Sequence, residues 1–171
     1  VERKQLRDLR THLEAMREGA GPDIDILLDL NFNMKTEGYL KILREIADMD
    51  MFWIEIDSYN PAALAYIRDH SPHPISSCET LLGLREFLPY FQAQSMDVAI
   101  IDAVWNGVWQ SMKIAAAAEA HEMNVAPHNF YGAVIKFSRH PGFALAFAPA
   151  DYAETRNQYD RRDRLSKVWR I

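Results

Sequence analysis

Short apolar segments alternate with amphipathic stretches along most of the chain, and this alternation restricts the fold more than any other feature. The apolar segments lie at residues 24–32, 51–56, 74–77, 97–101 and 124–127. Helical spacing of apolar residues is present before the Gly-Pro break at residues 19–23, and again at residues 36–49, 61–70, 81–94 and 108–123. Alternating strands and helices are typical of a parallel α/β sheet, and near-continuously apolar strands are typical of strands buried on both faces. The pattern therefore predicts a parallel α/β fold.

The units recur at intervals of about 25 residues, which favours a regular array. Five strands and about five helices can be placed before residue 131, whereas a complete (β/α)8 barrel has eight strands and typically about 250 residues. We therefore expect a partial (β/α)8 TIM barrel of alternating parallel strands and helices. None of the helical stretches opens with a glycine-rich phosphate-binding sequence, so a nucleotide site of the usual kind is not indicated.

Composition restricts the class of protein further. The 171 residues are 49% hydrophobic and 25% charged, which matches a globular domain rather than a disordered chain. A formal charge of −5 argues against a nucleic-acid-binding surface, and no apolar stretch approaches the roughly 18 residues that span a membrane. The start does not resemble a secretion signal, and the single cysteine, Cys78, cannot form an internal disulfide. We therefore expect a cytoplasmic protein.

A polar side chain stands where each apolar segment ends, at separations of 23 to 26 residues. These five residues are Asp29, Glu55, Glu79, Asp102 and His128. Side chains that return at the repeat period at the carboxyl end of each strand lie on one edge of the sheet. In α/β barrels that edge carries the active site.

The first three of these residues are carboxylates. Asp29, Glu55 and Glu79 would repel one another at a common edge unless a cation lay among them. Ligation by oxygen alone suits a hard divalent ion that keeps some of its waters, and Mg²⁺ is the natural choice. Each acid taken singly is better explained as a solvated carboxylate or a helix N-cap. The three in register predict a magnesium site.

Asp102 and His128 complete the series. A carboxylate beside a histidine fixes the tautomer of the ring and raises its basicity, which makes a general base near neutral pH. Taken singly, His128 is explained as a polar residue beside a proline, and Asp102 as a helix cap. Together with three carboxylates at the same edge, the two residues predict a catalytic pair.

Two further residues are candidates for substrate binding. Asn31 follows Asp29 by two residues and so points to the same side of the strand, where it could bond a metal ligand or the substrate, or simply form a turn. Trp105, with Trp109 and the aromatic residues 130–131, could line a substrate pocket or serve only in packing.

The segments around these residues resemble the enolase superfamily, specifically the mandelate racemase-like branch that includes acid-sugar dehydratases. The matching segments are DILLDLNFN with Asp29, MFWIEIDSYNP with Glu55, PISSCETLLG with Glu79, and MDVAIIDAVWNGVWQSMKIAAAAEAHEMNVAPHN with Asp102 and His128. The resemblance implies that the first three acids hold Mg²⁺. It also implies that the histidine–aspartate pair is the base that takes the proton alpha to a substrate carboxylate.

The departures from the family pattern set further expectations. Compared with the family, the chain is expected to lack the capping domain and the first barrel strands, including a Lys-x-Lys motif. Residues 55–57 read Glu-Ile-Asp where the family often has Glu-Glu-Pro, and residues 106–107 read Asn-Gly where it has two glycines. We therefore expect a partial enolase-superfamily barrel domain over residues 1–132 and a divergent tail of uncertain structure over residues 133–171.

Two functions remain open. The first is a Mg²⁺-dependent lyase that dehydrates a sugar acid, a small-molecule carboxylate, with His128 as the base. Racemisation would need a second base across the site, and the sequence shows no candidate. The second is a catalytically inactive barrel fragment that acts as a folded or oligomerising module, because the two edges of an open sheet can pair with another copy and form a homo-oligomer. Neither function involves nucleic acid or a membrane.

Overall fold

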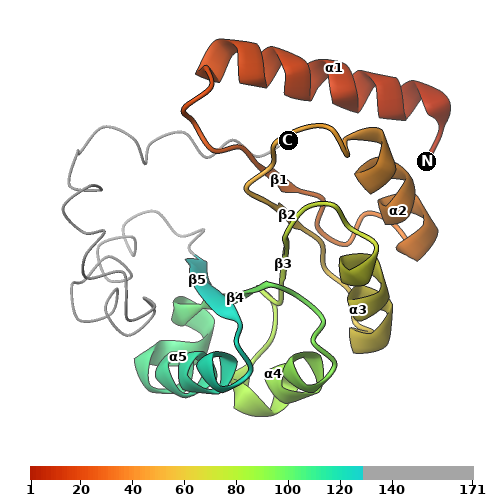
Figure 1. Cartoon of the computed structure of the whole chain (residues 1–171). Helices are drawn as coiled ribbons and strands as arrows, with labels where there is room; N and C mark the ends of the chain where they lie inside the picture. The colour runs from red at the N-terminus through yellow and green to blue at the C-terminus, as the bar shows by residue number, and fades with distance from the viewer. Residues whose placement is uncertain (129–171) are drawn as a thin grey trace.

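The computed structural model describes residues 1–128, which form one parallel sheet of five strands with the order β1-β2-β3-β4-β5 (Figure 1). The strands are β1 (Leu27–Asp29), β2 (Trp53–Glu55), β3 (Ile75–Ser77), β4 (Val98–Asp102) and β5 (Asn124–His128). The helices are α1 (Arg3–Ala20), α2 (Thr36–Glu45), α3 (Pro61–Asp69), α4 (Gly83–Gln92) and α5 (Ala103–Ala120). The predicted parallel α/β array, part of a barrel, is confirmed.

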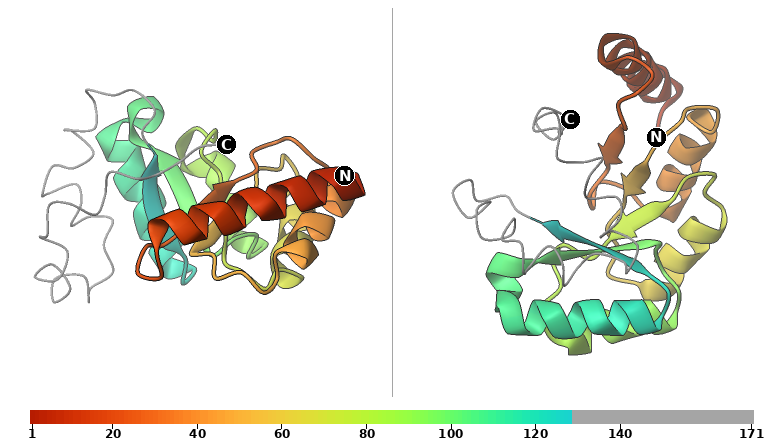
Figure 2. Two further views of the ribbon diagram at one scale, coloured as in Figure 1. Left: turned by 90° about the horizontal axis from the view of Figure 1, so that it is seen from above. Right: turned by 60° about the vertical axis from the view of Figure 1, so that its left-hand side comes forward.

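The sheet is curved, and its helices lie along the convex side (Figure 2). Consecutive helices from α1 to α5 pack against one another, so they form a continuous outer layer. The hydrophobic core lies between this layer and the strands, with Leu28, Ile54 and Ile75 pointing into it from the first three strands. Within residues 1–128 the concave side of the sheet is covered by no helix.

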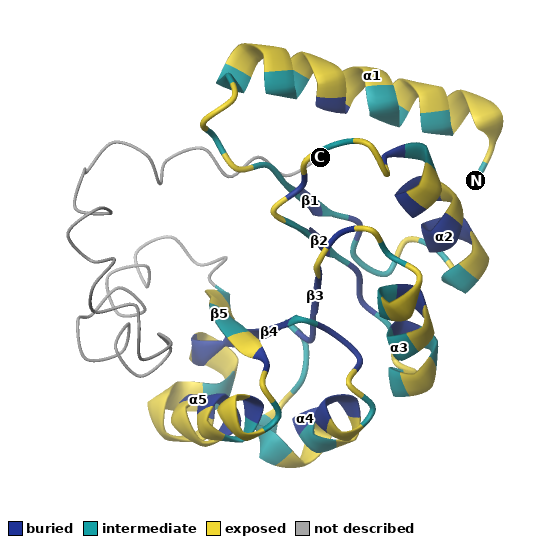
Figure 3. Ribbon diagram, viewed as in Figure 1, coloured by how far each residue is buried: buried dark blue, intermediate teal, exposed yellow. Residues whose placement is uncertain are grey.

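The burial of the strands differs from the sequence-based expectation (Figure 3). Strands β3 and β4 are buried along their whole length, whereas β1 and β2 are buried only at their central residues. β5 is partly exposed throughout. The expectation of strands buried on both faces is therefore correct for β3 and β4 and wrong for the other three. The reason is that alternate residues of a strand face opposite sides, and the positions flanking Leu28 and Ile54 face the concave side.

Helix α5 begins earlier than the sequence pattern indicates. Its first turn follows Asp102 directly, because the Asp102 Oδ1 atom accepts hydrogen bonds from the backbone N–H groups of Val104 at 2.8 Å and Trp105 at 3.0 Å. Gly107 then departs from helical geometry, with φ 67° and ψ 161°. This break explains why the apolar periodicity indicates a helix only from residue 108.

Arg10 is one of the residues that fix helix α1 to the rest of the domain. The Arg10 guanidinium donates to the Asp48 carboxylate at 2.6 and 2.8 Å and to the Glu45 carbonyl oxygen at 2.7 Å. This guanidinium lowers the pKa of Asp48 to about 2. Leu13 from the same helix is buried in the core.

None of the helices in the described part of the chain is both long and apolar enough to cross a membrane. The expected tail at residues 133–171 lies outside the described residues, as do the aromatic residues 130–131. The division of the chain at residue 132 stays a prediction.

Candidate functional site

The carboxyl ends of the strands bring the five polar residues singled out by the sequence to one edge of the sheet. Asp29 lies beside Glu55 in the register of β1 and β2, and Asp102 lies beside His128 in the register of β4 and β5. Glu79 lies two residues beyond the end of β3 and contacts His128. Each of the five strands therefore contributes one residue to this edge: four at the strand end itself and one, Glu79, in the turn that follows β3.

Glu79 connects the two sides of the site. It follows Cys78, which adopts the left-handed region with φ 86°, so the chain turns sharply at the end of β3. The Glu79 Oε2 atom lies 2.8 Å from the Nε2 atom of His128, and the Asn31 side-chain amide donates to Glu79 Oε1 at 3.3 Å. Glu79 thus contacts both the loop after β1 and the end of β5.

The two ring nitrogens of His128 face two different carboxylates. Nδ1 lies 2.7 Å from Asp102 Oδ2, and Nε2 faces Glu79. Asp102 is fully buried, and its other oxygen caps helix α5, so its position is fixed by the backbone. The contact with Glu79, and then that with Asp102, outweighs the opposing effect of burial and raises the pKa of His128 to about 9.

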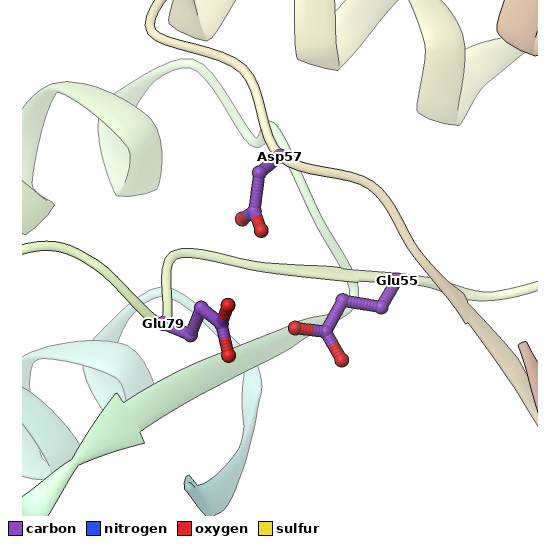
Figure 4. A group of neighbouring side chains, drawn as sticks. All are labelled: Glu55, Asp57 and Glu79. Carbon is purple, nitrogen blue, oxygen red and sulfur yellow. The ribbon is translucent and has the colours of Figure 1, made fainter. Parts of the chain in front are cut away.

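Three carboxylates converge on a common space: Glu55, Asp57 and Glu79 (Figure 4). One oxygen from each lies within 4.8 Å of the other two. Burial, reinforced by the charges of Asp29, Glu79 and Asp57, raises the pKa of Glu55 to about 8. Burial likewise raises the pKa of Asp57 to about 6, against the hydrogen bonds that it accepts. The cluster is therefore electrostatically unfavourable without a compensating charge.

The oxygen atoms of this cluster fit a hard divalent cation. Glu55 Oε1 and Asp57 Oδ2 are buried and have no hydrogen-bond partner among the described residues. Buried carboxylate oxygens are almost always satisfied by a donor or an ion, and Mg²⁺ takes oxygen ligands of this kind. Asp29 lies next to Glu55, close enough for its charge to raise the pKa of that residue. The cluster and Asp29 together are thus suited to hold Mg²⁺.

Asp57 is the site residue that sequence reasoning missed. It follows Glu55 by two residues, and alternation along an extended chain places both side chains on the same side. The Glu-Ile-Asp sequence of residues 55–57 is therefore the signal from which Asp57 could be found.

The two candidate substrate residues occupy different positions. Asn31 lies at the site with φ 47°, its backbone N–H donates to Asp29 Oδ1 at 2.9 Å, and its carbonyl oxygen accepts from the Tyr39 hydroxyl. Trp105 lies in the first turn of α5, where its side chain is half-exposed. A substrate-binding role for either stays a prediction.

A pocket opens beside the acidic cluster, between the loops after β2 and β3 and helix α4. Its lining residues are Tyr59, Thr80, Leu81, Glu86 and Tyr90. Thr80 directly follows Glu79, so the pocket begins next to the cluster. Tyr59 is largely exposed and stacks on Phe32 with ring centroids 4.6 Å apart. None of the sequence motifs indicates this pocket.

Carboxylates and a histidine at the carboxyl edge of a curved parallel sheet, with helices outside, define a domain of the α/β-barrel class. The family model described as enolase C-terminal domain-like matches residues 1–169. The chain therefore belongs to this family, as the sequence motifs predicted.

Relatives within the family differ in their reactions. The chain is 69% identical to a candidate L-alanine-DL-glutamate epimerase of Burkholderia xenovorans strain LB400, whose crystal structure contains magnesium and fumarate; the match has a TM-score of 0.82 and covers 86% of this chain and 36% of that one. It is 29% identical to the D-gluconate dehydratase of Thermoproteus tenax over 77% of this chain and 27% of the relative. It is 30% identical to the N-succinyl-L-Arg/Lys racemase of Bacillus cereus, over 63% of this chain and 30% of the relative.

These matches bear on the cofactor and on the length of the chain. Magnesium is present in the Burkholderia structure, and this chain presents an acidic cluster suited to the same ion, in agreement with the predicted cofactor. The chain spans about a third of the length of the relatives that it matches. Its relatives include dehydratases, a racemase and a candidate epimerase, so the family alone leaves the reaction open.

Proposed function

We propose that this chain carries a magnesium-dependent site at which His128 takes the proton alpha to a carboxylate of a small-molecule substrate. The observation that carries the proposal is the position of His128. Its ring lies between Asp102 and Glu79, at the margin of a cluster in which Glu55 Oε1 and Asp57 Oδ2 are buried and have no hydrogen-bond partner among the described residues. A base next to a cation site is the combination that abstraction of a weakly acidic C–H proton requires.

The residues of the proposed site would have different roles. Asp29, Glu55 and Glu79 would hold the ion, which when bound supplies a positive charge to stabilise the negative charge that develops on the substrate carboxylate. Asp102 orients the imidazole, because its Oδ2 atom accepts from Nδ1–H and leaves Nε2 facing the site. Glu79 is the largest cause of the raised pKa of His128, and a bound ion would offset the charge of Glu79, so the pKa of the ring would fall and Nε2 could take a proton. Asn31 holds Glu79 from the opposite side.

Dehydration of a sugar acid is the reaction that we favour. It needs one residue that can act first as base and then as acid, and within residues 1–128 His128 is the imidazole that faces the cluster. The dehydratases among the relatives support this choice. Epimerisation is the second candidate, because the relative with 69% identity is a candidate L-alanine-DL-glutamate epimerase. A second base, from outside the residues described, would then be required.

Hydrogen exchange separates these reactions. The full chain is incubated in D₂O with Mg²⁺ and either a panel of sugar acids or L-alanyl-L-glutamate, and proton NMR follows the signal alpha to the carboxylate. We expect exchange of that proton in the wild type, and none in His128→Asn or with EDTA. Accumulation of a keto acid identifies dehydration, and appearance of the epimeric dipeptide identifies epimerisation.

A folded wild-type chain that binds Mg²⁺ but exchanges no alpha proton in any of these compounds would contradict the proposal. Such a result would favour the inactive folded or oligomerising module, since β1 and β5 have no partner strand on their outer edges within the described part of the chain.

A further inference from the structure

Asp57 has two separate connections to the site. It lies two residues beyond the end of β2 and is only 3% exposed. Its backbone N–H donates to the carbonyl oxygen of Asn31 at 3.2 Å, so it is anchored to the loop after β1. Its carboxylate points from there toward Glu55 and Glu79 (Figure 4).

One oxygen of Asp57 has a clear structural task. Oδ1 accepts from the Ser77 hydroxyl at 2.9 Å and from the Cys78 backbone N–H at 3.1 Å. Cys78 is the left-handed residue at which the chain turns before Glu79. A non-glycine residue in this region is strained, and the bond to Asp57 helps to hold it there. Asp57 therefore fixes the turn that presents Glu79 to the site.

The other oxygen has no such task. Oδ2 is buried and has no hydrogen-bond partner among the described residues. If Asp57 served only to hold the turn, its Oδ2 atom could face a hydrogen-bond donor or solvent without any loss of stability. Instead, the carboxylate is directed toward two other acids, a position that is unfavourable for a negative charge without a neighbouring cation.

We propose that Asp57 is a fourth carboxylate of the cation site, which holds the Glu79 turn through Oδ1 and contributes to binding of the divalent ion through Oδ2. This assignment rests on the proposed function, because it assumes that the cluster binds Mg²⁺. It adds a residue that is not among the five polar residues predicted from the spacing of the strands. The cation site then draws on two acids from β2 and its extension, Glu55 and Asp57.

Calorimetric titration of the full chain with Mg²⁺ tests the assignment. Asp57→Asn keeps the shape of the side chain and removes its charge, so we expect the Mg²⁺ dissociation constant to rise about tenfold or more, as for residues that support metal ligands. Ser77→Ala removes a partner of Oδ1 but no charge, and a smaller rise is expected. Glu86→Gln is the matched control, since it removes an exposed charge from the pocket beside the cluster and should change the constant less than about twofold.

Urea unfolding in EDTA separates a metal-binding role from a purely structural one. We expect Asp57→Asn to be at least as stable as the wild type without metal, because the variant loses a buried, repelled charge. Unchanged Mg²⁺ affinity in folded Asp57→Asn would overturn the assignment while leaving the proposed function intact. If Asp57→Asn does not fold, the Mg²⁺ affinity of Asp57→Ser is measured instead, and an unchanged affinity would likewise overturn the assignment. A folded wild-type chain that binds no Mg²⁺ would contradict the cation site as a whole, and this assignment with it.

Discussion

The carboxylate of Asp102 serves His128 and helix α5 at the same time. Oδ2 lies 2.7 Å from Nδ1 of His128, while Oδ1 accepts the N–H groups of Val104 and Trp105 in the first turn of α5. The residue is fully buried, so both contacts are made away from solvent. The orientation of the proposed base is therefore tied to the start of the helix that follows β4.

This double role predicts different outcomes for two substitutions of Asp102. Asp102→Asn keeps an oxygen for the cap but places an amide against the imidazole, so proton exchange should fall at least about 100-fold with little loss of stability. Asp102→Ala should lose the same activity and also destabilise the chain by about 1–2 kcal/mol, because the cap is lost. Urea unfolding and the D₂O exchange assay provide the two measurements. Equal stability of the two variants would contradict the capping role.

A second pair of substitutions tests Asn31. Its φ of 47° is tolerated by asparagine and glycine but costs about 1 kcal/mol for alanine. Asn31→Gly and Asn31→Ala both remove the amide that donates to Glu79, so both should weaken Mg²⁺ binding by a similar factor. Only Asn31→Ala should also lower the free energy of unfolding. If Mg²⁺ affinity were unchanged in both variants, the contact with Glu79 would have no role in the site.

The contact between Arg10 and Asp48 predicts a pH dependence of stability. The pKa of Asp48 is lowered to about 2 from an ordinary value of 3.8, so the contact stabilises the chain above pH 3.8 and is lost as the pH falls toward 2. Both side chains are at the surface, and the effect should be small and weaker in high salt. Urea unfolding between pH 2 and 5 should show a shallower acid-side decline in Asp48→Asn than in the wild type. An identical decline would show that the ion pair contributes nothing.

The sequence is sufficient for the order of strands and helices and for the position of five polar residues at the carboxyl edge of the sheet. The repeat of apolar segments placed Asp29, Glu55 and Asp102 at the strand ends, where the structure has them. Strand ends are predictable in this way because the parallel arrangement puts every carboxyl end at one edge. The partial exposure of β1 and β2 was not predictable, because it depends on what covers the concave side.

The details of the site depend on contacts that periodicity does not encode. Asp57 was missed because its role arises from the sharp turn at Cys78, which brings Ser77 and Glu79 to it from the next strand. The early start of α5 was missed because a capping contact and an interrupting glycine hide the first turn. To predict either feature, the three-dimensional position of one polar side chain must be known: Asp57 in the first case and Asp102 in the second.

The account as a whole depends on the buried carboxylates sharing one divalent cation. Calorimetric titration with Mg²⁺ of the full chain, and of Glu55→Gln and Glu79→Gln, tests this directly. We predict that the wild type binds one ion per chain and that either substitution abolishes or severely weakens binding while the chain stays folded in EDTA. A folded wild-type chain that binds no Mg²⁺, or variants that bind it as tightly as the wild type, would contradict the account.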